Sequence, residues 1–300
     1  MEVLKVEHLT KDYGQGKGVF DMSFEIEQGE VLGFLGPNGA GKTTTIRHLL
    51  GFSRPQSGET SILGLDSFKK PKEIQRKLGY LPGEIAFPND MKGSQFIKYI
   101  AEMRGLKDMT KANKLIEQFE LDPSGDLKRM SKGMKQKIGI VCAFMHDPDI
   151  LILDEPTSGL DPLMQATFVE LIHEEKRNGK SILMSSHMFD EVDSTCDRIA
   201  MIKGGQLITI VNPKDIRRSQ TKTFKIEFIS HEDFKSMLKE SFSINETKPE
   251  INQIILDIDD AAINELLIAL SNRKVKYISE IKHNLEEQFM KYYEGGNSNV

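Results

Sequence analysis

The sequence predicts an α/β domain followed by a smaller α+β domain, and two observations lead to this prediction. Up to about residue 215, short apolar segments of strand length alternate with segments of helical periodicity, which is typical of an α/β fold. After Pro213 the order changes to strand, helix, two strands, helix and strand, the order of a ferredoxin-like split βαβ unit. We therefore place a boundary near residues 213–221 and assign residues 1–217 and 218–300 to the two domains.

The elements of the first domain follow from apolar periodicity and from turn residues. Helical periodicity covers residues 42–50, and Gly51 stands where that helix should end. Residues 88–146 are predicted to form a helical insert, because the pattern is helical from Phe96 to His146. The segments with a strand pattern are residues 2–8, 19–26, 31–35, 61–63, 78–81, 150–153, 181–185 and 199–202.

The second domain shows the same two kinds of periodicity in a different order. Strands are predicted at FKIEFI, within residues 245–258 as a pair, and at VKYISEI. Helices are predicted at HEDFKSMLKE and from Ala261 to Leu270. The segment NLEEQFMKYY at 284–293 is predicted to form a final amphipathic helix, with Leu285, Phe289 and Tyr292 on one face.

Composition excludes several classes of protein. Hydrophobic residues make up 38% and charged residues 28% of the 300 positions, as in soluble globular proteins. The longest apolar runs, such as IGIVCAFM, fall short of the roughly 18 residues that a membrane helix needs. Cys142 and Cys196 have neither metal-binding nor disulfide spacing, which fits a reducing cytoplasm. A net charge of -5 without a long basic run argues against a nucleic-acid groove, so we expect no nucleic-acid partner.

The stretch GPNGAGKTT fits the phosphate-binding pattern G-x-x-x-x-G-K-[ST], and it follows a predicted strand and begins a predicted helix. In this pattern the backbone N–H groups and the helix dipole hold phosphate oxygens, lysine neutralises the β- and γ-phosphates, and the hydroxyl after it ligates magnesium. The alternative, a tight turn with a solvated lysine, needs neither lysine nor threonine at these positions. The predicted nucleotide-binding residues are Gly36, Pro37, Asn38, Gly39, Ala40, Gly41, Lys42, Thr43 and Thr44.

A second motif, ILILDEP, is a buried strand that ends in two carboxylates. An apolar strand has no packing reason to end in this way. Asp154 is predicted to hold magnesium, as the corresponding aspartate does in P-loop proteins, and Glu155 to activate the attacking water. The alternative is a pair of solvated acids at the end of a strand.

Between these motifs lies RMSKGMKQKIG, where Ser131 is also a plausible N-cap of a helix. The order of the P-loop, SKGMKQ, LDEPTSGLD and SSH resembles the ATP-binding subunits of ABC transporters over residues 1 to about 215. This resemblance implies a P-loop ABC ATPase domain, with a RecA-like core, an N-terminal antiparallel β subdomain and a helical insert. It also implies ATP and Mg²⁺ as cofactors.

The resemblance assigns further residues one at a time. Ser131 and Gly133 are implied to bind the γ-phosphate of ATP held by the opposite subunit, although Met130, Lys132 and Met134 depart from the usual LSGGQ. The remaining assignments concern one aromatic residue, one acidic residue and one histidine, each of which has a structural alternative. Tyr13 either stacks on adenine or is a packing residue. Asp161 either contacts the other subunit across the dimer interface or is the N-cap of a helix, and it can do both. His187 is either the switch residue that senses the γ-phosphate or has no role.

One position departs from the family in a way that affects the metal site. ABC ATPases usually place a glutamine just after a YLP-like strand end, but Gly83 stands there in this chain. The nearest polar side chain is Glu84, whose carboxylate is a suitable oxygen ligand for magnesium. Glu84 is therefore either a magnesium ligand that couples the state of ATP to a membrane partner, or a solvated acid of the loop.

The resemblance also implies partners. Two copies, or this chain and a paralogue, would enclose two ATP molecules at the cytoplasmic face of the cell membrane, attached peripherally to a separate multi-span permease. GYLPGE, SKGMKQ and NLEEQFMKYY resemble drug, antimicrobial-peptide and sodium exporters with ABC-2 type permeases. We therefore expect ATP hydrolysis to power efflux of a drug, an antimicrobial or amphipathic peptide, or an ion.

Two other functions remain open at this point. A soluble ABC ATPase acting on nucleic acid or the ribosome is disfavoured, because the chain has one P-loop and no sustained heptad repeat. The C-terminal domain is either a small-ligand sensor or, as its lack of a pocket motif favours, a scaffold or dimer contact.

Overall fold

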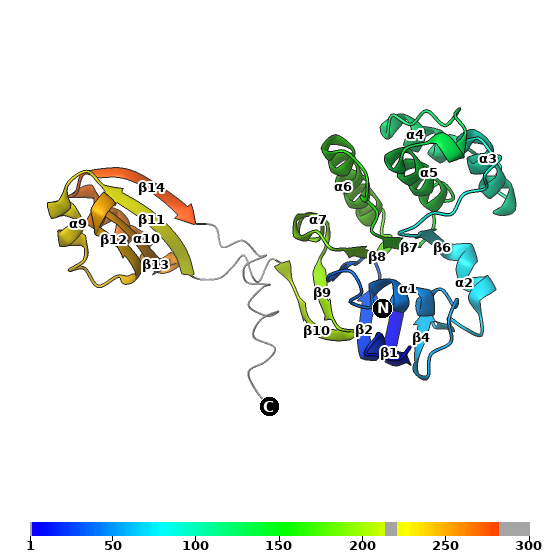
Figure 1. Ribbon diagram of the computed structural model, residues 1–300, viewed down its shortest axis with the longest axis horizontal. Coiled ribbons are helices and arrows are strands. Elements are labelled where there is room, and N and C mark those ends of the chain that lie inside the picture. The colour runs from blue at the N-terminus through cyan, green and yellow to red at the C-terminus, as the bar shows by residue number, and fades with distance from the viewer. Residues whose placement is uncertain (1, 214–220, 282–300) are drawn as a thin grey trace. The chain divides into compact units, whose positions relative to one another are not determined.

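The computed structural model describes residues 2–213 and 221–281 and divides into two compact units, residues 1–213 and 214–300 (Figure 1). In the described part of the chain, no helix is both long enough and apolar enough to cross a membrane.

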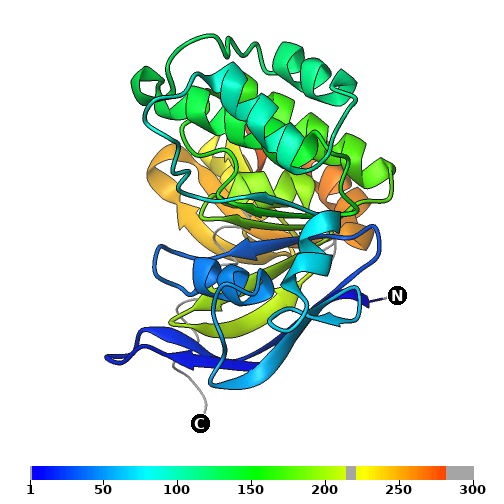
Figure 2. The same ribbon diagram turned by 90° about the vertical axis from the view of Figure 1, so that its right-hand side faces the viewer.

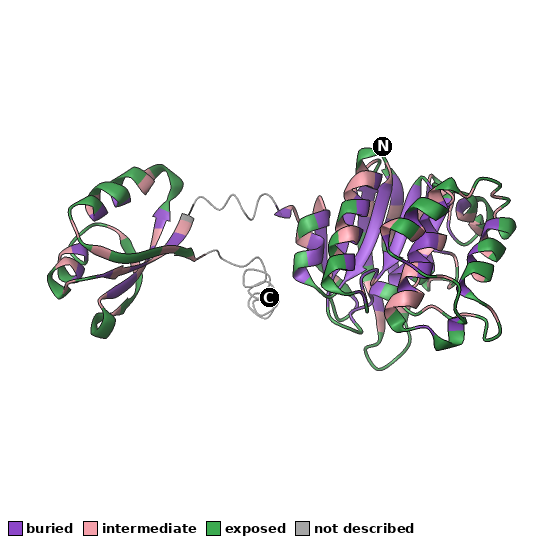
Figure 3. Cartoon of the chain, turned by 90° about the horizontal axis from the view of Figure 1, so that it is seen from above, coloured by how far each residue is buried: buried purple, intermediate pink, exposed green. Residues whose placement is uncertain are grey.

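A six-stranded sheet forms the centre of the first unit, in the order β10-β9-β3-β8-β7-β6. All neighbouring strands are parallel except β10, which runs antiparallel to β9. Every residue of β3, β7 and β8 is buried, as expected for strands covered by elements on both faces (Figure 3). The strands are β3 Val31–Leu35, β6 Leu78–Leu81, β7 Ile150–Asp154, β8 Ser181–Ser186, β9 Arg198–Lys203 and β10 Gln206–Val211.

A second, antiparallel sheet has the order β2-β1-β4-β5. Its apolar residues share one core with the central sheet and α1, as the contact between Phe24 and Phe34 illustrates, with ring centroids 4.7 Å apart. The N-terminal antiparallel β subdomain expected from the family resemblance is thus confirmed. The elements are β1 Glu2–Asp12, β2 Gly18–Glu27, α1 Lys42–Leu49, β4 Ser57–Ile62 and β5 Leu65–Asp66.

The helical insert is also confirmed, and Figures 1 and 2 show it on the side of the central sheet opposite the antiparallel sheet. Helices α6 and α7 lie on the same side as the insert. Strand β7 leads through a loop into α6, and β8 leads through a short loop into α7. Both loops therefore begin at the carboxyl end of the central sheet. The helical elements are α2 Pro71–Lys77, α3 Gly93–Met103, α4 Thr110–Gln118, η1 Leu127–Arg129, α5 Lys132–Phe144, α6 Pro162–Arg177 and α7 Phe189–Thr195.

The second unit has the predicted order of strands and helices, and its antiparallel sheet has the order β12-β13-β11-β14. This is the arrangement of a ferredoxin-like split βαβ unit, so that prediction is confirmed. Its core includes Ile226, Phe228, Phe234, Ile254 and Leu266. The elements are β11 Thr221–Phe228, α9 His231–Met237, β12 Ser243–Lys248, η2 Pro249–Ile251, β13 Gln253–Asp259, η3 Asp260–Ala262, α10 Ile263–Ser271 and β14 Val275–Ile281. The helix predicted at 284–293 lies outside the described residues.

Candidate nucleotide-binding site

The glycine-rich loop, residues 36–41, connects β3 to α1, and residues 42–44 of the motif form the first turn of that helix, as the sequence predicts. Gly41 precedes the helix with φ of 108°, a backbone conformation that favours glycine. A Cβ at Gly36 would clash with the backbone carbonyl of Ile202. The two glycines therefore allow a tight path that leads directly into the N-terminus of α1, where backbone N–H groups and the helix dipole favour a bound anion.

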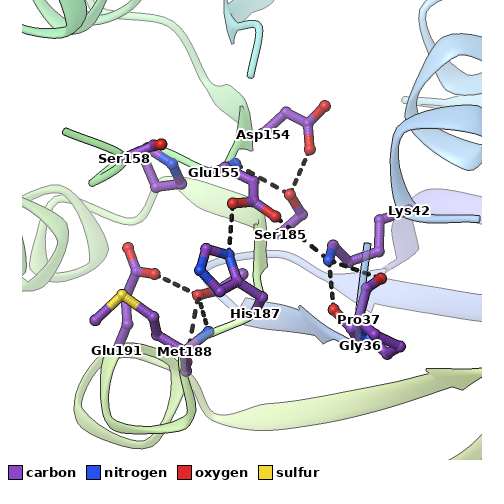
Figure 4. A network of polar contacts seen from close by, with 12 residues as sticks. Gly36, Pro37, Lys42, Asp154, Glu155, Ser158, Ser185, His187, Met188 and Glu191 are labelled. Atoms are coloured by element: carbon purple, nitrogen blue, oxygen red, sulfur yellow. Dashed lines mark hydrogen bonds and ion pairs between the residues drawn. The ribbon is translucent and has the colours of Figure 1, made fainter. Parts of the chain in front are cut away.

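Lys42 is the first residue of α1, and its side chain is 6% exposed. Its Nζ atom donates to the carbonyl of Gly36 at 2.5 Å and lies 3.4 Å from the carbonyl of Pro37 (Figure 4). The same atom lies 3.4 Å from Oε1 of Glu155. The ammonium group is thus held at the loop by acceptors from two different segments of the chain.

Asp154 ends β7 and is 2% exposed. Its Oδ2 atom accepts a hydrogen bond from Oγ1 of Thr43 at 2.8 Å, and its Oδ1 atom accepts one from Oγ of Ser185 at 2.5 Å. This carboxylate therefore joins the glycine-rich loop to the end of the neighbouring strand β8.

Glu155 follows Asp154 with φ of 50°, which is uncommon for a residue other than glycine. Its backbone N–H donates to Ser185, with Oγ at 3.0 Å and the carbonyl at 3.2 Å. Its Oε2 atom lies 2.6 Å from Nδ1 of His187 (Figure 4). The carboxylate thus lies between His187 on one side and Lys42 on the other.

One cavity of about 420 Å³ brings several predicted residues together. This volume is within the range of small-molecule sites. Its lining consists of Tyr13, Lys17, Gly18, Pro37, Asn38, Gly39, Ala40, Gly41, Lys42, Thr43, Thr44 and Glu155. Tyr13 is 57% exposed, which leaves its ring open to contact. The glycine-rich loop, the predicted adenine-stacking residue and the predicted base therefore border the same space.

The SKGMKQ segment lies outside the lining of this cavity and is tied to the segment after β7 instead. Ser131 is exposed and caps α5 by accepting from the N–H of Met134 at 3.2 Å. A Cβ at Gly133 would lie 2.5 Å from the carbonyl of Gly159. Gln136, 3% exposed, donates to the carbonyl of Pro156 at 2.7 Å. The start of α5 is therefore packed on the loop that carries Glu155.

Asp161 and Glu84 also lie outside the lining of the cavity. Asp161 caps α6 by accepting from the N–H of Met164 at 3.0 Å, which is the structural role expected for it. Glu84 is exposed on the loop after β6. A Cβ at the preceding Gly83 would lie 3.4 Å from Oδ2 of Asp154, so this loop passes directly beside the acidic end of β7.

Sequence reasoning missed four polar residues around the Glu155–His187 pair. Ser185 contacts Asp154 and the backbone of Glu155 as described above. Glu191, on α7, is 7% exposed, and its Oε2 atom accepts from Oγ of Ser186 at 2.5 Å. Burial raises the pKa of Glu191, and the nearby side chains of Ser186 and Thr157 oppose that rise. A signal was available for two of these residues, because Ser185 and Ser186 are polar residues at the end of the apolar strand β8.

Comparisons with known proteins identify the family. The sequence profile described as ABC transporter matches residues 19–158. The chain is 31% identical to the bacitracin transport ATP-binding protein BcrA of Bacillus licheniformis, over 98% of each chain. It is 38% identical to the ABC transporter ATP-binding protein NatA of Bacillus subtilis strain 168, over 64% of this chain and 80% of that one. A solved structure of an ATP-binding subunit of an ABC transporter is 32% identical, with a TM-score of 0.66, and the match covers 72% of this chain and 92% of that one.

The chain belongs to the family of ABC transporter ATP-binding proteins. It is an ATP-binding subunit with ATPase activity, built on the P-loop fold described above. The alternative of a soluble ATPase acting on nucleic acid or the ribosome is not favoured, because the two relatives given above are named as transport or transporter ATP-binding proteins.

Proposed function

We propose that this chain is the motor subunit of an exporter, which drives efflux of a drug, an antimicrobial or amphipathic peptide, or an ion through a separate multi-span permease of the ABC-2 type. A relative named for bacitracin transport, similar over nearly the whole chain, supports this class of cargo. The proposed location is peripheral, at the cytoplasmic face of the cell membrane, where the permease would hold the subunit.

We further propose that two subunits, identical or paralogous, enclose two ATP molecules. The support is that Ser131, Gly133 and Asp161 lie outside the cavity lined by the glycine-rich loop of the same chain. A second subunit would supply its own Ser131 and Gly133 to the γ-phosphate, and Asp161 would contribute to the contact between subunits. Neither cavity would then be complete in one subunit alone.

The residues at the cavity have separate roles in binding ATP. Tyr13 would stack on adenine, and the backbone N–H groups of residues 36–44 would hold phosphate oxygens. Lys42 would exchange its present carbonyl acceptors for the β- and γ-phosphates, which are stronger partners for an ammonium group.

The residues beside the glycine-rich loop are also suitable ligands for Mg²⁺. The Thr43 hydroxyl and the Asp154 carboxylate, 2.8 Å apart, are hard oxygen donors of the kind this ion takes. When bound, Mg²⁺ supplies positive charge that stabilises the charge on the transferred phosphoryl group. Glu84 is proposed as a further oxygen ligand, because its loop passes beside Asp154.

The observation that carries the proposed hydrolysis is the position of the Glu155 carboxylate, 2.6 Å from Nδ1 of His187 and 3.4 Å from Nζ of Lys42. Glu155 would accept a proton from the attacking water, which makes the water oxygen a better nucleophile. His187 would orient the carboxylate and contact the γ-phosphate, while Lys42 stabilises the negative charge that develops there.

The variant Glu155→Gln tests this assignment. The amide keeps the size of the side chain but does not accept a proton, so turnover should fall by roughly 100-fold or more while ATP affinity stays nearly unchanged. Phosphate release measures turnover, a fluorescent ATP analogue measures affinity, and gel filtration should show an ATP-bound dimer.

Glu174→Gln provides the matched control. Glu174 is an acid on α6 paired with Lys114 at 2.6 Å, and it lies outside the lining of the nucleotide cavity. This control should keep the parent's turnover. Equal turnover in the Glu155 and Glu174 variants would show that Glu155 is not the base.

A further inference from the structure

Helix α7 carries a buried carboxylate that the proposed chemistry does not use. Glu191 is 7% exposed, and Figure 4 shows it next to Met188 and His187. A buried carboxylate loses much of its hydration, which is unfavourable unless hydrogen bonds replace the water. An apolar side chain at position 191 would be buried without losing hydration. The presence of a carboxylate here therefore points to a role for its contacts.

The Glu191 carboxylate contacts the turn that carries His187. The Ser186 hydroxyl lies 2.5 Å from Oε2 of Glu191 and accepts from the N–H of Met188 at 2.9 Å. It therefore links the two residues that flank His187, and Glu191 fixes the orientation of this hydroxyl. The His187 side chain is half exposed, and the contacts of its two neighbours hold the backbone of this turn.

The second carboxylate oxygen of Glu191, Oε1, is buried and has no hydrogen-bond partner in the described part of the chain. The Glu191 carboxylate therefore acts through Oε2, on the turn that carries His187.

The backbone of Glu191 is itself held in place. The hydroxyl of Thr195 donates to the carbonyl of Glu191 at 2.7 Å. Helix α7 packs tightly on β3, because a Cβ at Gly33 would lie 3.0 Å from Cγ1 of Val192 and 2.8 Å from Sγ of Cys196. The carboxyl group therefore projects from a helix that is fixed against the centre of the sheet.

We propose that Glu191 is a positioning residue for ATP hydrolysis, which holds the turn that carries His187 so that the His187 side chain stays within hydrogen-bonding distance of Glu155. Glu191 does not touch the nucleotide in this role. The inference rests on the proposed roles of Glu155 and His187. Small displacements of a catalytic pair lower turnover strongly, while contacts to the phosphates and adenine remain unaffected.

The test compares Glu191→Ala with Glu191→Gln in the full-length chain. Residues that orient catalytic groups typically contribute about 10- to 100-fold to activity, so the alanine variant should lose turnover in that range. Its KM for ATP and its affinity for a fluorescent ATP analogue should stay within about twofold of the parent. The glutamine variant retains an acceptor oxygen for the Ser186 hydroxyl and should recover most of the turnover.

Two further variants distinguish positioning from a general loss of stability. Glu175→Ala removes another buried carboxylate, 2% exposed and paired with Lys111 on α4, and should lower the melting temperature without lowering turnover. Ser186→Ala removes the hydroxyl that contacts Glu191 and should lower turnover even if Glu191→Ala fails to fold.

The outcomes separate this inference from the proposed function. If Glu155→Gln in the same assay loses turnover but Glu191→Ala and Ser186→Ala both match the parent, the positioning role is wrong and the base assignment stands. If KM and turnover in the Glu191 variants change together, or glutamine does no better than alanine, Glu191 is only a structural residue. If Glu155→Gln keeps full turnover, the proposed function fails first.

Discussion

The two compact units use their polar side chains in different ways. In the first unit, Asp154 and Ser185 meet where the parallel strands β7 and β8 end. In the second unit, whose sheet is antiparallel, Arg273 joins α9 to α10 through Ser236, Ala269 and Glu240. Parallel strands bring their carboxyl ends to one edge, where functional groups can gather, whereas antiparallel strands send alternate ends to opposite edges.

Because of this difference, a basic side chain serves ligand binding in the first unit and internal packing in the second. Lys42 is held by carbonyls and by Glu155 at a cavity, where a phosphate can replace those acceptors. Arg273 is held by partners on two helices, Ser236 on α9 and Ala269 on α10, and its loss should separate those helices. Polar groups at the edge of the parallel sheet are therefore available to a ligand, whereas those of the second unit stabilise its own packing.

The largest expected effect follows from replacing Lys42 with alanine. A charged contact to phosphate that exists in both the ground state and the transition state would be lost, so ATP affinity should fall roughly 10- to 100-fold. Isothermal titration calorimetry of the full-length chain measures this change. Arg273→Ala is the contrasting variant, and it should keep ATP affinity while lowering the stability of the second unit by about 2 kcal/mol.

The comparison fails if the two variants behave alike. Normal ATP affinity in Lys42→Ala would contradict the role of the glycine-rich loop. A large loss of ATP affinity in Arg273→Ala would mean that the second unit takes part in nucleotide binding.

A smaller effect concerns pH. Burial, with Arg104 nearby, lowers the pKa of His146 from 6.5 to about 4. As the pH falls from 6.5 toward 4, the unfolded chain binds a proton that the folded chain does not, so the free energy of unfolding decreases. Since His146 is partly exposed, the decrease from about pH 7 to about pH 5 should be about 1 to 2 kcal/mol.

His146→Gln isolates this contribution. The glutamine does not titrate and can still contact the carbonyl of Leu78, which lies 3.2 Å from Nε2 of His146. Denaturant unfolding at the two pH values should show a smaller loss of stability in the variant than in the parent. The same loss in both proteins would assign the pH dependence to other groups.

The smallest expected effect follows from removing the second unit. A chain cut after about residue 218 should fold and bind ATP with an affinity within about twofold of the parent, because a truncation at a domain boundary leaves the remaining core intact. Binding of a fluorescent ATP analogue measures this. An insoluble product, or one without ATP binding, would show that the second unit completes the ATPase core.

Two strands with a continuous apolar run could be predicted to the residue, whereas the predictions at 150–153 and 181–185 each end one residue before β7 and β8 do. Residues 31–35 and 78–81 were bounded correctly, because polar or turn-forming residues flank each run. Strand β10 was missed, since its half-exposed pattern gives only a weak signal. Gly204 and Gly205, with φ of 55° and 80°, form the kind of turn that joins hairpin strands, and this pair was the overlooked signal.

The residues of the candidate site could be predicted where a local motif contains them. The glycine-rich loop, Asp154 and Glu155 each stand in a short pattern whose chemistry is specific. Ser185 and Glu191 do not, because their roles depend on which strands are neighbours and which helix packs behind them. That information is tertiary, and a single sequence does not contain it in readable form.

The left-handed backbone of Glu155 has an evolutionary consequence. A side chain in this conformation costs about 1 kcal/mol relative to glycine, which adopts it freely. Selection for heat resistance alone would therefore favour glycine at this position, while selection for ATP turnover would keep the acid. Laboratory evolution that selects for thermal stability without screening for phosphate release should therefore replace Glu155 early, and ATPase activity would be lost with it.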